Sequence, residues 1–559
     1  MLMPKGRGKW RAVAAAGSRY GRLTLVWGVQ RDLPALARTP FDLLVIGGGI
    51  VGACVARDAA LRGLRVALVE RGDFAGGISW NSLKIVHGGL RSLQGLDIAQ
   101  ARHFVRERRA WLTIAPHLVE PLAFAVPTRG FGRESAMLMR AGLALNDLVS
   151  ANRNAGVVAS RRLPAGRALS RVELRTLAPG VFDRYTGSAL FHDAQLYSAE
   201  RLVIALLDDA VRAGATVANY AEVVGAMREA GELTGAVVRD ALGGGSGERF
   251  DVRARMIVNA AGAGAARVAD MLTGREGVAS PMRGIALNLM LAGDERVQTA
   301  FALTSNDEGR MRRLFVVPWR GRTLVGTAHY PCEQMPASSA DLEPFVERFV
   351  CEVAAAWPTR ALSRDSVLLV HAGMQPLPHG APGTRTHGPP EHTIIDHANT
   401  GTPQLLTATG PKLTTSRAIA EELVDLVSAR SGRATRPCET ATRPLASTPP
   451  DDVAIAVARA LATDRAGMPD DVVTHLVRSY GAGYDALLAM VREQPGLGAR
   501  IEEGSPVVAA QLAYALDNEM AMTPDDLLER RTELGPTARV THRSREAARA
   551  AIDAPEHKR

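Results

Sequence analysis

Three glycines, Gly47, Gly49 and Gly52, form a G-x-G-x-x-G pattern in the run Gly-Gly-Gly-Ile-Val-Gly. In this pattern the first glycine permits a tight turn, the second lets backbone N–H groups approach a diphosphate, and the third lets a helix pack closely on a strand. Glu70 follows Gly49 by 21 residues, where a carboxylate can accept hydrogen bonds from an adenosine ribose. The spacing predicts a dinucleotide site. The alternative is a glycine turn used only for packing, with Glu70 at a solvated strand end.

The elements that must position these residues lie on both sides of the glycines. Residues 41–46 form a continuous apolar run, as expected of a strand buried on both faces of a parallel sheet. A helical stretch runs to about Leu61, Gly63 ends it, and residues 65–70 form a second apolar strand. The sequence therefore predicts a βαβ unit that begins at about residue 41.

The composition is that of a globular protein with several domains. The chain has 559 residues, of which 46% are apolar and 22% are charged. Its length favours two or three domains. No stretch approaches the roughly 18 uninterrupted apolar residues of a confident transmembrane helix. The four cysteines are widely separated, which favours a reducing compartment.

The net charge of +9 is concentrated at the N-terminus. Residues 1–40 contribute +7 of it, from eight Lys or Arg side chains and one Asp, so the rest of the chain is nearly neutral. This distribution argues against a nucleic-acid-binding protein, whose basic side chains line a folded surface. The stretch also lacks the apolar core and cleavage site of a secretory signal. It is either a disordered or misassigned leader, or an arm that touches anionic lipid or another polyanion.

Two later segments favour FAD over NAD. Residues 74–91 are polar and punctuated by glycine, where a simple NAD fold would continue into its next helix. An extended loop of this kind can run beneath a flavin. Residues 407–416 open a predicted helix over 416–428, and such a helix N-terminus can stabilise negative charge on a reduced flavin ring.

Further elements follow the same logic. Apolar residues at helical spacing predict an amphipathic helix over 199–211, followed by a strand over 215–218. Another apolar strand enters a glycine turn at 256–262. Residues 375–403, rich in Pro, Gly and His, predict an irregular loop, and residues 437–450 a linker that leads into helices.

The run 79–91, Ser-Trp-Asn-Ser-Leu-Lys-Ile-Val-His-Gly-Gly-Leu-Arg, resembles the signature loop of the FAD-dependent glycerol-3-phosphate dehydrogenase family. The resemblance covers most of 41–535 and does not include 1–40. Segments that share it lie at 106–109, 115–121, 200–202, 259–262, 318–319 and 412–415, and, toward the family's C-terminal helical domain, at 478–481 and 518–531.

The resemblance implies an α/β fold in which a Rossmann-like FAD-binding domain of the GR2/DAO type is interleaved with a mixed-sheet substrate domain, followed by an all-α C-terminal domain. The expected ranges are 1–40 for a disordered basic leader, 41–125, 196–280 and 396–430 for the discontinuous FAD-binding domain, 126–195 and 281–395 for the substrate or cap domain, 431–450 for a linker, 451–540 for the helical domain and 541–559 for a tail.

The family relationship also implies an activity and a cofactor. The secondary alcohol of sn-glycerol 3-phosphate gives a hydride to N5 of FAD and yields dihydroxyacetone phosphate, and the electrons pass to a quinone or another acceptor. The cofactor-binding residues expected from the glycine pattern and the resemblance are Gly47, Gly48, Gly49, Ile50, Val51, Gly52, Glu70, Arg71, Ser79, Asn81, Ser82, Lys84, His87, Gly88, Gly89, Leu90, Val223, Ala260, Ala261, Gly262, Gly410, Lys412, Leu413 and Thr414.

The expected catalytic residues are His87, Arg91, Lys412 and Gln375. Arg91 matches a family arginine near the substrate, where a fixed guanidinium suits a phosphate or carboxylate. Lys412 matches a family lysine beside the flavin. Histidine is the side chain that exchanges protons near neutral pH, so His87 is the candidate for proton transfer. Its alternative role is structural support of the loop.

Several positions depart from the family pattern, and all lie on the expected substrate side. Gln375 and Pro390 stand where the family usually has arginines. Ala286 replaces a histidine, the pair 328–329 reads Ala-His in place of Thr-Asp, and the pair 263–264 reads Ala-Gly where a Trp is expected. Each lost charge-assisted hydrogen bond to a phosphate is worth about 1.5–3 kcal/mol. FAD binding therefore survives more surely than glycerol-3-phosphate specificity.

These departures leave alternatives open. Arg385 is a candidate substitute for a missing arginine. The chain is either a glycerol-3-phosphate dehydrogenase, a paralogue that oxidises a different hydroxy or amino compound, or an FAD-holding scaffold without turnover.

Partners and location are expected from the same reasoning. His371, His379, His387, His392 and His397 fit no short zinc motif, so no metal is expected. We expect a small-molecule substrate, a quinone or other electron acceptor and no nucleic acid, with a homodimer as one option. The expected location is the cytoplasm, with an option of peripheral contact with the inner face of the membrane through the basic leader and C-terminus.

Overall fold

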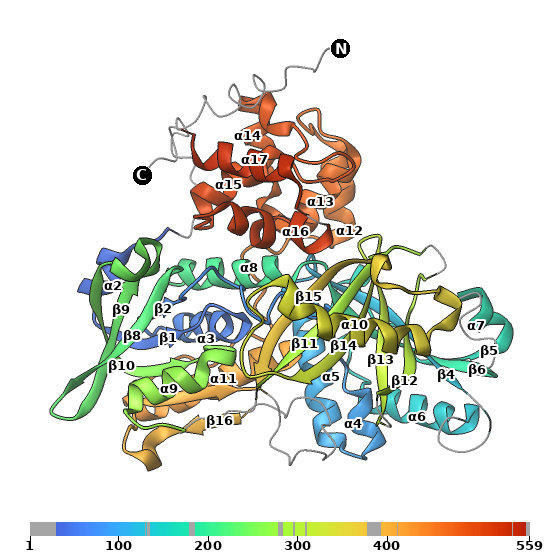
Figure 1. Ribbon diagram of the computed structural model, residues 1–559, viewed down its shortest axis with the longest axis horizontal. Helices are drawn as coiled ribbons and strands as arrows, with labels where there is room; N and C mark the ends of the chain where they lie inside the picture. Colours follow the sequence, from blue (N-terminus) through green and yellow to red (C-terminus); the bar gives the residue numbers. More distant parts are fainter. Residues whose placement is uncertain are drawn as a thin grey trace.

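The computed structural model describes residues 30–128, 130, 135–177, 185–277, 283–294, 297–307, 310–376, 393–410, 412–538 and 540–554. Two β-sheets with their helices lie side by side, and the C-terminal helices form a layer above both (Figure 1).

The first sheet carries the predicted βαβ unit. Its central strands run parallel, whereas β16, β9 and β8 are antiparallel to their neighbours. In spatial order they are β16 (Thr393–Asp396), β17 (Leu405–Thr409), β10 (Arg249–Asn259), β1 (Phe41–Ile46), β2 (Val66–Val69) and β7 (Thr216–Ala218), with the hairpin β8 (Ala221–Glu229) and β9 (Glu232–Asp240) attached to β10.

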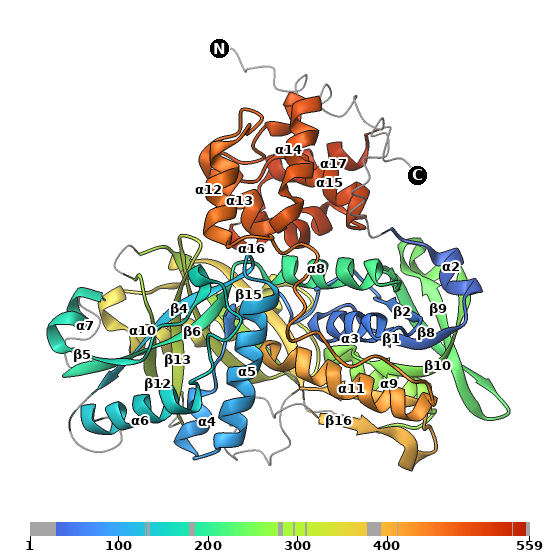
Figure 2. The same ribbon diagram turned by 180° about the vertical axis from the view of Figure 1, so that it is seen from behind.

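Strand β1 is buried on both faces, as its apolar run predicts. Leu43 and Val45 pack into the core beneath α3 (Ile50–Leu61), α8 (Ala199–Arg212) and α11 (Ser416–Ser431), which lie together on one face of the sheet (Figure 2). Leu44 and Ile46 point to the other face, which α9 (Ala265–Thr273) covers. This alternation follows from the two-residue period of a strand.

The second sheet is mixed. In spatial order its strands are β15 (Val367–Pro376), β11 (Arg283–Ala292), β14 (Arg322–Pro331), β13 (Arg310–Trp319), β12 (Ala300–Asp307), β4 (Val119–Thr128), β6 (Gly187–Leu196) and β3 (Ile85–Val86), with β5 (Arg167–Ser170) paired to β6. Helix α10 (Ser339–Ala356) packs on one face through Val346 and Phe349. The opposite face receives Leu83 and Ile85 from the segment that follows β2. The loop over 74–91, called the flavin-type loop below, therefore lies against this sheet.

Helices flank both sheets and build the C-terminal layer. Beside the second sheet lie α4 (Leu90–Gln94), α5 (Ile98–Ile114), α6 (Ala136–Val149) and α7 (Arg171–Leu177). The C-terminal layer comprises α12 (Val453–Ala462), α13 (Asp470–Tyr480), α14 (Tyr484–Glu493), α15 (Ala509–Asn518), the π-helical turn η10 (Asp526–Arg531), α16 (Leu534–Thr537) and α17 (His542–Ile552). These helices enclose a hydrophobic core of their own, so the predicted fold class is confirmed.

The end of the predicted disordered leader is folded, which corrects the range 1–40. Residues 33–38 form helix α2 (Leu33–Arg38), and Leu36 is fully buried beside the first sheet. Arg31 pairs with Asp240 at 2.7 Å and donates to the carbonyl of Asn219. The high count of basic residues over 1–40 favoured a disordered leader, so sequence reasoning missed helix α2 and the Arg31–Asp240 pair. Residues 1–29 lie outside the described part of the chain.

Two other predicted boundaries also need correction. Strand β4 lies entirely in the second sheet, so 119–125 belong with the substrate-side sheet. In the expected tail, Ala547 and Ala548 of α17 are buried in the C-terminal core. The other domain ranges stay a prediction.

Candidate functional site

The glycine turn has no room for side chains at two of its positions, so a ligand would meet its backbone amides there. Gly47 has φ +113°, and a Cβ there would lie 2.5 Å from the Ala260 carbonyl oxygen. A Cβ at Gly52 would lie 1.9 Å from the Gly47 carbonyl oxygen. The turn therefore tolerates no side chain at either position. Helix α3 begins at Ile50, so its N-terminal amides and partial positive charge point at this turn.

Glu70 lies beside the same turn, directly after the carboxyl end of β2. Its Oε2 accepts a hydrogen bond from the Gly48 amide at 2.7 Å, and its Oε1 accepts from the Gly72 amide at 2.9 Å. Burial raises the pKa of the Glu70 carboxyl, against the opposing effect of these two amides. The neighbouring Arg71 is exposed. Val223 is buried in β8, which follows β7, the neighbour of β2 in the first sheet.

The segment after β2 connects the glycine turn with the second sheet. Ser79 Oγ accepts a hydrogen bond from the Ile50 amide at 3.0 Å, at the start of α3. The Asn81 carbonyl accepts from Asn288 Nδ2 of β11 at 2.8 Å. Asn81 Oδ1 is buried and has no hydrogen-bond partner among the described residues. Such an orphaned acceptor suits a ligand hydroxyl or N–H group.

Lys84 anchors this segment from below. Its fully buried Nζ lies 3.1 Å from Glu200 Oε1 of α8 and donates to the Trp80 carbonyl. Ser82 Oγ accepts from the Lys84 amide at 3.2 Å. Burial lowers the pKa of the Lys84 ammonium, although Glu200 acts in the opposite direction. The side chain thus holds the loop; its predicted contact with the cofactor stays a prediction.

His87 stands at the end of the loop. Its backbone amide donates to Thr414 Oγ1 at 3.0 Å, and its Nδ1 lies 3.4 Å from Asp193 Oδ2 of β6. The imidazole side chain is 41% exposed. One ring nitrogen therefore faces a buried carboxylate while the ring stays accessible.

Asp193 was missed by sequence reasoning. Its Oδ1 accepts hydrogen bonds from the Gly88 amide at 2.8 Å and from Arg108 Nη1 at 2.6 Å. Burial alone would raise the pKa of Asp193, but the His87 ring and the Arg108 guanidinium bring it below its ordinary value. The carboxylate is thus held ionised beside the His87 ring.

The residues between β17 and α11 also border the site, opposite the loop that carries His87. Gly410 and Lys412 follow β17, and Leu413 and Thr414 begin the short turn before α11. The Thr414 carbonyl accepts from Trp111 Nε1 at 2.9 Å. Lys412 Nζ lies 5.0 Å from the centre of the Phe104 ring.

The remaining expected cofactor residues complete the same region. Ala260 follows β10 and donates its amide to the Ile46 carbonyl at 2.8 Å, so 260–262 lies beside the glycine turn. Gly88, Gly89 and Leu90 continue from His87 into α4. Arg91 lies in α4, and its side chain is outside the described part of the molecule.

Gln375 meets His329 on the face of the second sheet that carries Gly373. Gln375 lies on β15 and His329 on β14, and Gln375 Nε2 is 2.6 Å from His329 Nδ1. The two side chains meet across β11, where Gly284 and Ala286 are too small to separate them. Burial, and then the charge of Arg312, lower the pKa of His329 to about 4. The pair is therefore neutral at physiological pH.

This sheet face borders the flavin-type loop. A Cβ at Gly373 would lie 2.6 Å from Ile78 Cδ1, and β15 also contacts the turn at 262–264. Gln375 therefore stands near both segments. Pro390 and Arg385 lie outside the described residues, as do His379, His387 and His392. Among the residues that are described, no group of three or more His, Cys, Asp or Glu side chains is arranged to hold a metal ion.

The residues present fit FAD. Segments 47–52, 79–90 and 260–262, together with residues 410 and 412–414, converge from four parts of the chain. At Gly47 and Gly52 the backbone of the turn packs too closely on other backbone atoms to admit a Cβ, and Asn81 Oδ1 is an acceptor without a hydrogen-bond partner among the described residues. The converging segments extend beyond the glycine turn, as the ribityl chain and the isoalloxazine ring of FAD require.

Comparison with known proteins decides the family. Residues 42–426 match the model of FAD dependent oxidoreductases, and residues 438–557 match the C-terminal domain of alpha-glycerophosphate oxidase. The glycerol-3-phosphate dehydrogenase of Synechocystis is 32% identical over 516 residues, which cover 90% of this chain and 91% of that protein. The chain belongs to the FAD-dependent glycerol-3-phosphate dehydrogenase family.

Other family members agree. The mitochondrial glycerol-3-phosphate dehydrogenase SDP6 of Arabidopsis thaliana is 30% identical, covering 90% of this chain and 80% of its own length. The glycerol-3-phosphate dehydrogenase of Bacillus halodurans, solved with FAD, superposes with a TM-score of 0.71 at 23% identity and covers 94% of this chain and 92% of that one. Membership confirms FAD as the cofactor and an FAD-dependent dehydrogenase as the enzyme class. None of the helices in the described ranges has the length and apolar character needed to cross a bilayer.

Proposed function

We propose that the protein oxidises the secondary alcohol of sn-glycerol 3-phosphate to dihydroxyacetone phosphate and passes the electrons to a quinone or another acceptor. The observation that carries the proposal is the match to a glycerol-3-phosphate dehydrogenase along 90% of the chain. Exposed His87, at the end of the flavin-type loop, supports it as the group that handles the alcohol proton.

Bound FAD supplies a two-electron acceptor at N5. The chain must then remove the alcohol proton and hold the reacting carbon in place. His87 is the proposed base. Asp193 accepts a hydrogen bond from His87 Nδ1, so that Nε2 is available to the alcohol of the substrate. Once the proton has moved to Nε2, the Asp193 carboxylate stabilises the charged imidazolium. Arg91 is proposed for the anionic end of the substrate, and Lys412 for the flavin side.

The direct test is anaerobic bleaching of the yellow holoprotein. With glycerol 3-phosphate, the flavin absorbance should disappear in a single turnover, and an artificial acceptor should restore it. Flavin that stays oxidised with glycerol 3-phosphate would reject this substrate. Flavin that stays oxidised across polyol phosphates, hydroxy acids and amines would favour the FAD-holding scaffold.

The Gln375–His329 pair favours a second candidate, a dehydrogenase for a different hydroxy or amino compound. The tautomer that fits has Gln375 Nε2 donating to His329 Nδ1, which leaves His329 Nε2–H as a donor and Gln375 Oε1 as an acceptor. A neutral donor and acceptor suit an uncharged polar group better than a phosphate dianion.

Replacing Gln375 with Arg should separate the two candidates. A guanidinium beside the substrate adds a charge-assisted hydrogen bond worth about 1.5–3 kcal/mol, or roughly ten- to a hundredfold in the KM for glycerol 3-phosphate. If the natural substrate lacks a phosphate, its own KM should worsen in the same variant. Gln375→Glu is the control of opposite charge. If Gln375→Arg leaves both KM values unchanged, Gln375 does not face the substrate.

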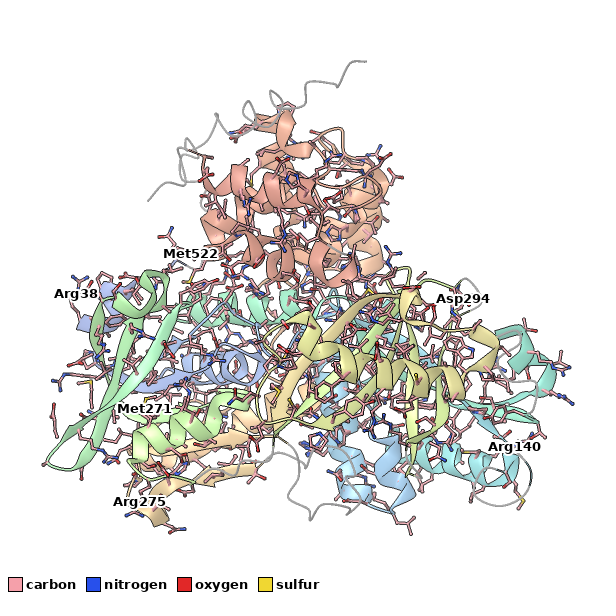
Figure 3. All side chains as sticks on the ribbon, in the orientation of Figure 1. Arg38, Arg140, Met271, Arg275, Asp294 and Met522 are labelled. Atoms are coloured by element: carbon pink, nitrogen blue, oxygen red, sulfur yellow. The ribbon has the colours of Figure 1, made fainter. Side chains whose placement is uncertain are left out.

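An exposed apolar stripe supports peripheral membrane contact. On α6, Met137 is 82% and Leu148 74% exposed, and the exposed Ala141 and Ala144 lie between them on the same helix face. Helices α4 and α6 lie along the edge opposite the C-terminal domain (Figure 1), where Figure 3 also labels Arg140. Monomeric soluble proteins seldom expose such a stripe without a partner.

Helix α6, which carries the stripe, packs against α4 through Val149 and Leu93. Leu96, 75% exposed, follows α4, and α4 begins one residue after Gly89. A quinone dissolved in the bilayer would thus meet the protein near the end of the flavin loop. We propose a cytoplasmic protein that docks on the inner membrane face at this edge. A homodimer remains a separate prediction.

Charge placed on the stripe should abolish docking. The double change Met137→Asp and Leu148→Asp is expected to lower binding to anionic lipid vesicles by about tenfold or more, because apolar burial is replaced by carboxylates that anionic headgroups repel. Ile455, 54% exposed on α12, gives the matched control Ile455→Asp. Co-sedimentation with the vesicles measures the effect. Equal binding by all three proteins would count against this face.

A further inference from the structure

The position of Glu70 depends on the turn that follows it. The Gly72 amide donates to Glu70 Oε1 at 2.9 Å, and the Gly72 carbonyl accepts from the Tyr220 amide at 2.8 Å. The Ala75 amide donates to the Gly48 carbonyl at 3.0 Å. The carboxylate expected at the ribose and the glycine turn expected at the diphosphate are therefore both tied to residues 70–75.

The C-terminal domain holds the same turn through Asp73. Arg531 donates from Nη1 and Nη2 to the two carboxylate oxygens of Asp73, each at 2.7 Å, and Arg530 Nε donates to Oδ2 at 2.8 Å. The side chains of Asp73 and Arg531 are at most 1% exposed. Both arginines come from η10, more than 450 positions away along the chain.

The surrounding contacts fix this arrangement. Asn219 Nδ2 donates both to Asp73 Oδ1 at 3.0 Å and to the Met520 carbonyl at 2.8 Å, so it also joins the two domains. Asp526 pairs with Arg530 at 3.0 Å. Met522, labelled in Figure 3, lies at this junction beneath the helical domain, and its amide donates to Asp526 Oδ2 at 2.8 Å.

Burial makes the contact all-or-none. A buried carboxylate that loses its partners is strongly destabilised, whereas a bidentate arginine holds it in one geometry. Burial alone would raise the pKa of Asp73, yet Arg531 and Arg530 bring it below its ordinary value. The turn at 70–75 therefore cannot shift without disturbing η10.

We propose that Arg530 and Arg531 are positioning residues for the cofactor: docking of the C-terminal helical domain on Asp73 sets the affinity for FAD. Thermodynamic linkage requires the reverse effect, so FAD binding strengthens the docking by the same factor. A purely structural contact makes a different prediction. It would stabilise the apoprotein and the holoprotein equally, and its loss would leave FAD affinity unchanged.

The test compares two substitutions with a matched control in the full-length protein. Arg531→Lys keeps the charge and loses the bidentate geometry, and Arg530→Ala removes the less buried partner. Glu120→Gln breaks a different link to the C-terminal domain, the 2.8 Å pair of Glu120 with Arg478, far along the chain from the ribose turn. FAD titration of the apoproteins should give a Kd at least about tenfold higher for the two arginine variants and within about twofold of wild type for Glu120→Gln.

Two further measurements follow FAD binding, and the first needs no variant. Hydrogen exchange of the wild-type backbone over 519–533 should slow when FAD is added, although none of the residues expected to bind the cofactor lies in this range. The rise in Tm caused by FAD should also be smaller in Arg531→Lys than in wild type. Unchanged Kd values in the arginine variants, an equal loss in Glu120→Gln, or exchange over 519–533 that ignores FAD would each overturn the proposal. All three readouts follow FAD alone, so an error in the proposed substrate would not affect them.

Discussion

Replacing His87 with glutamine is expected to lower the rate of flavin reduction by about 10²- to 10⁴-fold, the usual contribution of a positioned general base. Glutamine can still donate to Asp193 but cannot accept the alcohol proton at neutral pH. Rapid-mixing measurement of flavin bleaching under anaerobic conditions gives this rate without interference from the electron acceptor.

Two further observations separate a base from a structural histidine. His87→Gln should keep the wild-type Kd for FAD, so that its loss of rate reports proton transfer and not cofactor binding. His542, 86% exposed on α17, provides the control His542→Gln, which should behave as wild type. A His87→Gln variant that retains FAD and bleaches at the wild-type rate would leave His87 with only its structural role.

Replacing Gly47 with alanine is expected to abolish retention of FAD. The new methyl group would lie 2.5 Å from the Ala260 carbonyl oxygen, and φ +113° is a conformation that L-residues rarely adopt. Strain of this kind costs about 1–3 kcal/mol, and displacing the turn also removes its amides from the diphosphate. We expect the Kd for FAD to rise by on the order of a hundredfold.

Gly142 offers the matched control. It lies in α6, outside the segments expected to bind the cofactor, and a Cβ there would meet no heavy atom within 4 Å, so Gly142→Ala should bind FAD normally. The ratio of flavin to protein absorbance after purification gives a first measurement, and titration of the apoprotein gives the second. Circular dichroism should show both variants folded. A yellow Gly47→Ala protein of normal affinity would remove the diphosphate from this turn.

Local patterns were sufficient for the elements near the glycine turn. The apolar run at 41–46 becomes β1 with the same bounds, and the amphipathic stripe at 199–211 becomes α8 with one added residue. In each case nearest neighbours in sequence determine burial. The pairing of β4 with β6 joins residues that lie from 59 (Thr128 with Gly187) to 77 (Val119 with Leu196) positions apart, and no local signal reports it. The boundary at 125 was wrong for this reason.

The candidate site divides in the same way. Glu70 and His87 could be found because a motif or a characteristic loop contains them. Asp193 lies 105 positions from Gly88 in an ordinary strand, and only the pairing of β3 and β6 brings the two together. The contact of His329 with Gln375 likewise spans 46 positions and depends on small residues in the strand between them. The burial of Leu36 was not predicted, because the basic residues around it favoured a disordered leader.

The order of strands in the first sheet has a consequence for biosynthesis. Strand β10 can pair with its outer neighbour β17 only after residue 409 has been synthesised. Asp73 can pair with Arg530 and Arg531 only after those two residues have been synthesised as well. A nascent chain that stalls in between exposes the unpaired edge of β10, which invites aggregation. We therefore expect that translation must be nearly complete before the flavin can be captured.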